Sequence, residues 1–210
     1  MTSRTPTPDE TPAGAAARIL RGVLLLGRGD PRGIASFGSG PEALLSALAP
    51  SVALCLVTIL SQALRGYDAI GVVKIFLLIV TLLSRLVVSQ FMAVIWKRDD
   101  RWIRYATASL WCNWLPIVIM LFAVSLVQLL SPGAASGGSA VGGVVLGVEL
   151  YELWLSWFVA RAGLEIGGGK AALLIVAVNV SLMLLYGLAA LLPPHYNVIS
   201  ELLAPMGKPH

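Results

Sequence analysis

Five long apolar runs dominate the chain between residues 42 and 194. Each is close to the roughly 20 apolar residues that a helix needs to cross a bilayer. Short segments rich in charge, glycine or proline separate the runs, and such residues are typical of helix ends and turns. We therefore predict an all-α fold class, a polytopic membrane protein with a bundle of five transmembrane helices and a short N-terminal interfacial helix. The predicted spans are residues 44–64, 69–96, 103–130, 140–160 and 171–192.

The segment before the first span has a different pattern. Residues 1–16 are rich in Pro and Thr and lack bulky apolar side chains, which predicts a disordered tail. The next apolar run, ARILRGVLLLG, is too short to span and carries Arg18 and Arg21, which predicts an amphipathic helix at the membrane surface. The expected organisation is a tail (1–16), an interfacial helix with a Gly/Pro linker (17–41), a transmembrane domain (42–194) and a short C-terminal tail (195–210).

Composition supports a membrane protein and indicates its orientation. Hydrophobic residues make up 57% of the chain and charged residues 12%, which excludes an ordinary soluble globule. We interpret the net charge of +4 as topological rather than as a nucleic-acid signal, because 11 Lys and Arg residues fall on one side of the predicted spans and 3 on the other. The prediction is a multi-pass protein of the inner (plasma) membrane, with its N-terminus cytoplasmic and its C-terminus outside.

Polar side chains inside the predicted spans are the candidates for function. At 1.5 Å per residue they fall in one layer, roughly 12 to 17 Å from the predicted cytoplasmic helix ends. Intramembrane polar groups are expensive, so this belt is either structural or a ligand or proton site. Its members are Arg85, Asn113, Glu149, Glu152 and Asn179.

An isolated charge in hydrocarbon costs several kcal/mol or more, so we expect Arg85 to pair with Glu149, Glu152 or both. One arginine cannot neutralise two carboxylates. The belt is then either structural glue between the helices, or the surplus carboxylate carries protons or binds a cation or polar ligand. A dry, fully paired belt favours the first reading, and a water-accessible cavity at the belt favours the second.

Two further features concern helix geometry. Gly143 and Gly147 form a small-xxx-small pattern that permits close helix packing. Pro116 is expected to kink the third span and to free a carbonyl near the belt.

The sequence offers little for catalysis, and we expect no enzyme activity, no catalytic residues, no cofactor and no metal. Gly167 to Lys170 resembles a phosphate loop, but Leu164 and Ala171 occupy positions that need glycine and Ser or Thr. We interpret this segment as a glycine-rich helix stop. The two histidines, His195 and His210, follow the last span.

The order of parts resembles the Yip1 family of five-span membrane proteins, in a bacterial form that also has an Asn-Trp pair in its third span. The resemblance to that family rests on the N-terminal RGVLLLGRGDPRG segment, on the five closely spaced spans, and on Tyr151-Glu152-Leu153-Trp154 with the WFVAR run that leads into GGGKAA at residues 167–172. Asn113-Trp114 carries a likeness to uncharacterised bacterial membrane proteins that have this pair in the third span. The family resemblance implies a non-enzymatic membrane role. Eukaryotic members are linked to Rab GTPases, which a bacterial member lacks.

Three functional hypotheses follow from these observations. The first is a Yip1-like role in membrane organisation or protein interaction, and the second is a small transporter or channel that uses the Arg/Glu belt. The third is an accessory subunit of a larger membrane complex. The expected partners are the lipid bilayer and other membrane proteins or further copies of the chain, and not nucleic acid.

Overall fold

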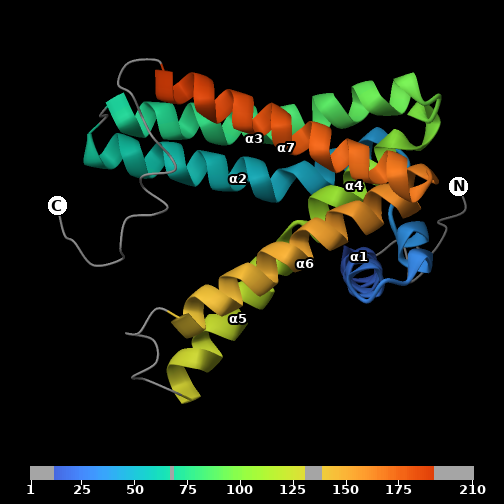
Figure 1. Cartoon of the computed structure of the whole chain (residues 1–210), viewed down its shortest axis with the longest axis horizontal. Coiled ribbons are helices and arrows are strands. Elements are labelled where there is room, and N and C mark those ends of the chain that lie inside the picture. Colours follow the sequence, from blue (N-terminus) through green and yellow to red (C-terminus); the bar gives the residue numbers. More distant parts are fainter. Residues whose placement is uncertain (1–11, 67–68, 131–138, 192–210) are drawn as a thin grey trace, which may run out of the picture.

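The computed structural model describes residues 12–66, 69–130 and 139–191, and every regular element in these ranges is a helix (Figure 1). The predicted all-α class is confirmed there. The C-terminal tail predicted at 195–210 and residues 1–11 lie outside the described residues. The elements are α1 (Pro12–Gly27), the 3-10 helix η2 (Pro31–Ser36), α2 (Pro41–Arg65), α3 (Ala69–Ile95), α4 (Asp99–Cys112), α5 (Trp114–Leu130), α6 (Ser139–Leu164) and α7 (Gly168–Leu191).

Within the described ranges, five helical segments are long and apolar enough to cross a bilayer. They agree with the predicted spans to within a few residues. The third begins at Asp99, four residues earlier than expected, because Asp99 and Asp100 occupy the first turn of α4. Carboxylates are favourable there, next to the positive end of the helix dipole. The segments are Pro41–Leu64, Gly71–Ile95, Asp99–Leu130, Val141–Leu164 and Gly168–Leu191.

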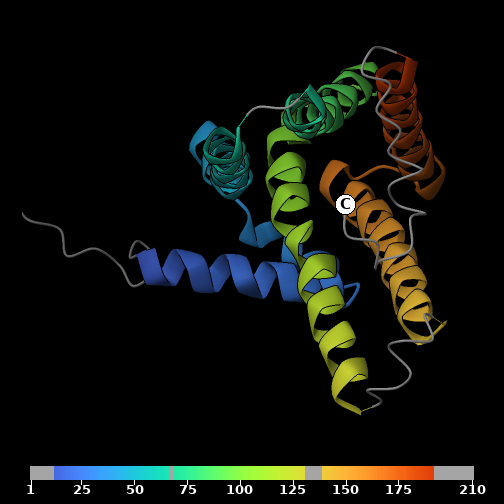
Figure 2. The same ribbon diagram turned by 90° about the vertical axis from the view of Figure 1, so that its left-hand side faces the viewer.

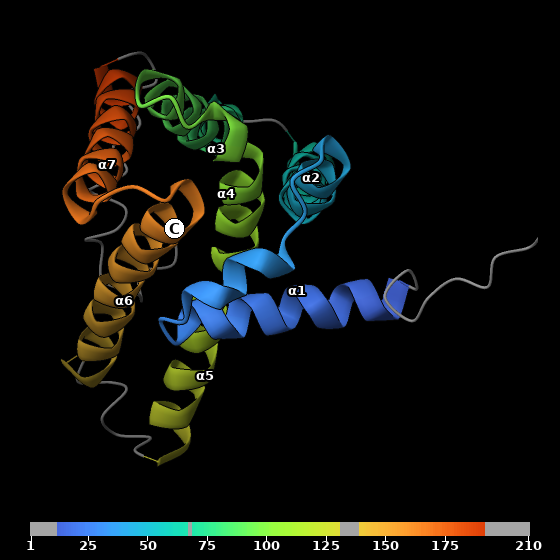
Figure 3. The same cartoon turned by 90° about the vertical axis from the view of Figure 1, so that its right-hand side faces the viewer.

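The third span is interrupted at Asn113, where α4 ends and α5 begins. Pro116 has no N–H to donate to the carbonyl of Cys112, and its ring collides with that carbonyl in a regular helix. Asn113 keeps right-handed helical angles (φ −61°, ψ −21°), so α5 continues roughly in the direction of α4 (Figure 3). Pro116 was expected to kink the third span; the structure shows instead a one-residue interruption three residues before the proline, with little change of direction (Figure 3).

The spans form two groups that diverge from a common end. The helices α2, α3 and α7 run in similar directions, whereas α5 and α6 make a second pair that slants away from them (Figures 1 and 2). The helix α4 packs against α2, α3 and α6 and joins the two groups. The described chain is therefore V-shaped, with its helices packed at one end.

Apolar burial is concentrated at this packed end. The core draws side chains from α1, α4, α6 and α7, and elsewhere the spans are open, with only 11% to 22% of each span buried. In a membrane protein the remaining apolar faces meet lipid. The largest fully buried side chains are Leu26, Thr107, Val159, Leu164 and Leu174.

Two non-glycine residues end helices at the packed end. Lys97 follows α3 with φ 56° and Glu165 follows α6 with φ 49°, both left-handed. The amide of Arg98 donates to the carbonyl of Ala93 over 2.8 Å, and that of Ile166 donates to Arg161 over 3.3 Å, as in helix ends with a left-handed cap. The predicted glycine stop was wrong in position: Glu165 ends α6, and Gly168 opens α7.

The N-terminal helix crosses the α4–α5 rod rather than running beside it (Figure 3). The predicted helix at residues 17–27 is confirmed, but it begins at Pro12, so residues 12–16 are helical and not part of a disordered tail. Proline suits the first helical position, and the alanines that follow are strong helix formers. Its interfacial location stays a prediction. At its far end the Tyr151 hydroxyl donates to the Gly27 carbonyl over 2.8 Å.

Gly33 allows η2 to lie directly on α1. A Cβ at Gly33 would lie 2.7 Å from the carbonyl oxygen of Gly22 and 2.9 Å from Cγ of Leu26. We predict that Gly33→Ala lowers the stability of the purified protein by about 1–3 kcal/mol through overpacking, seen as a lower midpoint of thermal unfolding in detergent.

Gly187→Ala is the matched control, because a Cβ there meets nothing within 4 Å and alanine is the better helix former. It should leave the midpoint unchanged or raise it. Equal midpoints for the two variants would contradict the close contact between η2 and α1.

Candidate functional site

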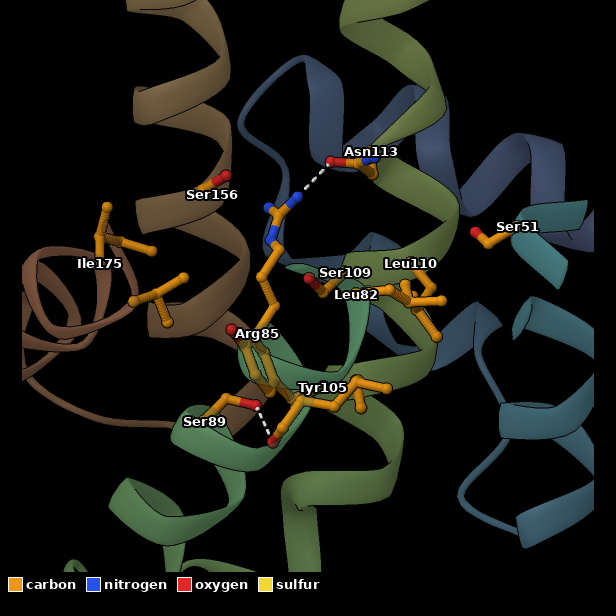
Figure 4. Close-up of a pocket in the computed structure, with 13 residues that line it drawn as sticks. Ser51, Leu82, Arg85, Ser89, Tyr105, Ser109, Leu110, Asn113, Ser156 and Ile175 are labelled. Atoms are coloured by element: carbon orange, nitrogen blue, oxygen red, sulfur yellow. Dashed lines mark hydrogen bonds between the residues drawn. The ribbon is translucent and has the colours of Figure 1, made fainter. Parts of the chain in front are cut away.

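Arg85 of α3 is the centre of the polar region inside the spans. Its Nη1 donates to Oδ1 of Asn113 over 2.8 Å (Figure 4). Around it lies a cavity of about 60 Å³, which we call the Arg85 chamber. Its polar lining consists of Ser51, Arg85, Ser89, Tyr105, Ser109, Asn113 and Ser156.

Helical spacing places these groups on the same side of their helices. Tyr105, Ser109 and Asn113 are separated by four residues each, so they share one face of α4. Ser89 stands four residues after Arg85 on α3, and Ser156 comes from α6 (Figure 4). Asn113 sits at the break before Pro116, so the same irregularity that ends α4 holds the partner of Arg85.

A second cavity, of about 120 Å³, lies between α6, α7 and Arg85, and we call it the acidic cavity. Both glutamates line it, together with Arg85, Ser156 and Asn179. A smaller pocket of about 10 Å³ shares Arg85, Asn113, Glu152 and Ser156. Arg85 and Ser156 therefore line all three spaces.

The expected ion pair between Arg85 and the glutamates is not found: no salt bridge joins Arg85 to Glu149 or Glu152, all three being described residues. The helix contacts explain this result. α3 packs on α4 and α7, whereas α6 packs on α4, α5 and α7, so the nearest polar partner of Arg85 comes from the α4–α5 junction.

The charges are consequently left for water or a ligand to satisfy. Glu149 is exposed, while Glu152 and Arg85 are half-buried. An unpaired charge at the centre of a membrane helix costs about 2.5–3.5 kcal/mol on insertion scales. A polar cavity of more than about 10–15 Å³ has room for water, and both the Arg85 chamber and the acidic cavity exceed that size.

Asn179 and the glycine pair are placed differently from the rest of the candidates. Nδ2 of Asn179 donates to the carbonyl of Ile175 on its own helix over 2.8 Å, so its bond is local although it lines the acidic cavity. A Cβ at Gly143 or Gly147 would meet nothing within 4 Å. These glycines therefore do not pack against another described helix. If they have the predicted packing role, the helix that packs on them belongs to another molecule.

Several hydroxyl groups that the sequence analysis did not select support the site. Ser84 and Ser181 are hydrogen-bonded, and the hydroxyls of Thr81 and Tyr186 lie 3.3 Å apart, which ties the part of α3 that precedes Arg85 to α7. Nε1 of Trp102 donates to Oγ of Ser89 over 3.1 Å, tying α4 to α3. The sequence contained one sign of these supporting hydroxyls: the four-residue spacing of Tyr105, Ser109 and Asn113, which places them on one face of a helix.

No protein-family model, curated protein or solved structure matches the chain. The resemblance to the Yip1 family stays a prediction. In the part of the chain that the structure describes, no group of three or more His, Cys, Asp or Glu side chains is placed to hold a metal ion.

Replacing Asn113 tests its role as the partner of Arg85. We predict that Asn113→Leu destabilises the protein by about 1–3 kcal/mol, because it leaves a guanidinium donor without its acceptor in a low-dielectric region. Thermal unfolding in detergent measures the effect. In the Arg85→Met background the same change should cost much less, so a double-mutant cycle isolates the pair.

Asn179→Leu is the matched control, since it removes only a hydrogen bond to its own helix. It should be close to neutral. Additive losses in the cycle, or equal losses for the two leucine variants, would contradict the Arg85–Asn113 bond as the link between α3 and the α4–α5 junction.

Proposed function

We propose that the protein is a small transporter or channel of the plasma membrane, working through the polar region around Arg85. The observation that carries the proposal is the unpaired state of Arg85 with respect to Glu149 and Glu152, beside cavities of about 60 and 120 Å³. Groups used only as structural glue would gain most from direct pairing. Charges that line water-sized spaces suit the binding and release of a small species instead.

The size of the cavities sets the class of substrate. Each has room for a few water molecules or a small ion. We therefore favour a small ion or a proton as the species that moves. The two glutamates would carry protons or attract cations, and Arg85 would hold the opposite charge at the same depth.

The exposed position of Glu149 implies that the described chain is not the whole functional unit. A carboxylate open to lipid is unfavourable, so a second copy of the chain or another membrane protein would cover it. A single bundle of five helices is also too narrow to enclose a transport pathway. The proposal therefore includes an oligomer or a complex.

A Yip1-like organising role, or that of an accessory subunit, is the second candidate. It is favoured by the open face of α6, where Gly142, Gly143 and Gly147 have no neighbour within 4 Å of an added Cβ. Small residues allow close approach of another membrane helix. This candidate expects the α6 face to be covered by a partner protein and expects no ion flux.

We predict that the purified protein in liposomes dissipates an imposed pH gradient faster than empty liposomes do. Glu149→Gln and Glu152→Gln remove the carboxyl groups, and at least one should lower the rate on the order of tenfold, because amides cannot carry protons through the membrane. A pH-sensitive dye inside the vesicles measures the rate.

Glu42→Gln is the matched control, because Glu42 lies in the first turn of α2 and outside both cavities. Liposomes that contain this variant should dissipate the pH gradient at the wild-type rate. Proton flux equal to that of empty liposomes, together with no flux across a panel of small ions, would overturn the transport proposal and leave the interaction role.

A further inference from the structure

The Arg85 chamber and the acidic cavity differ in charge although they share Arg85 and Ser156. The residues that line the Arg85 chamber include one cation and no carboxylate. Glu149 and Glu152 line the acidic cavity instead. The chamber is also rich in hydroxyl groups, supplied by Ser51, Ser89, Tyr105, Ser109 and Ser156 (Figure 4). Arg85 therefore faces carboxylates in the acidic cavity, whereas in the Arg85 chamber its own positive charge meets only hydroxyl and amide groups among the polar lining residues.

We propose that the Arg85 chamber binds a small monovalent inorganic anion, such as chloride or nitrate. This inference rests on the proposed transport function and names an ion for it. The guanidinium has N–H donors beyond the one that bonds Asn113, and the hydroxyls of Ser51, Tyr105, Ser109 and Ser156 can also donate to an anion, whereas that of Ser89 donates to the carbonyl of Leu86. One bound anion would neutralise the Arg85 guanidinium, which forms no salt bridge with a described carboxylate.

Other occupants fit the chamber less well. A metal cation would be repelled by the guanidinium, since the chamber lining offers no carboxylate to offset it. A phosphate ester or a carboxylate with a long chain exceeds a cavity of about 60 Å³. Water alone fills the space but leaves the charge of Arg85 uncompensated in a membrane span.

Glu152 is the competing group within the protein, because it shares the small pocket with Arg85 and Asn113. A shift of the Glu152 carboxylate onto Arg85 would take the place of the anion. The Glu152→Gln variant should therefore bind the anion at least as tightly as the wild type does. Weaker binding in this variant would contradict the competition.

The line width of the chloride NMR signal measures binding to the full-length protein in detergent. We expect excess broadening that saturates and that added nitrate removes. Arg85→Gln should weaken this binding about tenfold or more, because charge-assisted hydrogen bonds are the strong ones. Lys74→Gln, which changes another basic residue of α3 outside the chamber lining, should bind chloride as the wild type does.

If Arg85→Gln fails to fold, Ser109→Ala with Ser156→Ala keeps the charge and removes two hydroxyl donors, and it should weaken binding several-fold. Broadening that is absent in the wild type, or that is as large in folded Arg85→Gln and in the Ser109→Ala, Ser156→Ala variant as in the wild type, would overturn the anion site. Chloride flux into liposomes separates the two proposals. Binding without flux of any ion supports the anion site and rejects transport, whereas proton flux without chloride binding rejects the anion site alone.

Discussion

The hydrogen bond from Arg85 to Asn113 is the interaction on which the polar region depends. It exists because Pro116 breaks the third span at Asn113, three residues upstream, and leaves an amide side chain facing α3. An arginine inside a membrane span is costly, and the bond satisfies only part of its hydrogen-bonding capacity. The rest of the guanidinium faces cavities lined by hydroxyl groups on one side and by carboxylates on the other.

The packing of the helices decides which charges meet. The apolar core at the joined end holds α1, α4, α6 and α7 together, and from there α5 and α6 diverge from α2, α3 and α7 (Figures 1 and 2). Because α6 does not pack along α3, the glutamates and Arg85 surround a common space without closing it. Lipid can cover the apolar faces, but it cannot satisfy the exposed carboxylate of Glu149, which is why the account requires water, an ion or a partner there.

Much of the fold could be predicted from the sequence because the bilayer imposes a strong length and hydropathy constraint. The five spans followed from this constraint, and an irregularity in the third span followed from the backbone chemistry of Pro116. The common level of Arg85, Glu149 and Glu152, which line one cavity, also followed, since the rise per residue is fixed in a helix. The choice of partner did not follow, because equal depth says nothing about which helices are neighbours. The left-handed caps at Lys97 and Glu165 were missed because glycine is the usual residue there, and near Glu165 three glycines stood close by.

Water access at Ser156 tests the central claim most directly, because this side chain lines both cavities and the small pocket between α3 and α6. Ser156→Cys would be made in a protein whose Cys55 and Cys112 are replaced by alanine, with Val118→Cys as a control on the exposed apolar face of α5. A small, charged, water-soluble thiol reagent should modify the cysteine at 156 and leave that at 118 unmodified. Equal lack of reaction at both positions would mean that the region around Arg85 is dry, and would contradict the account.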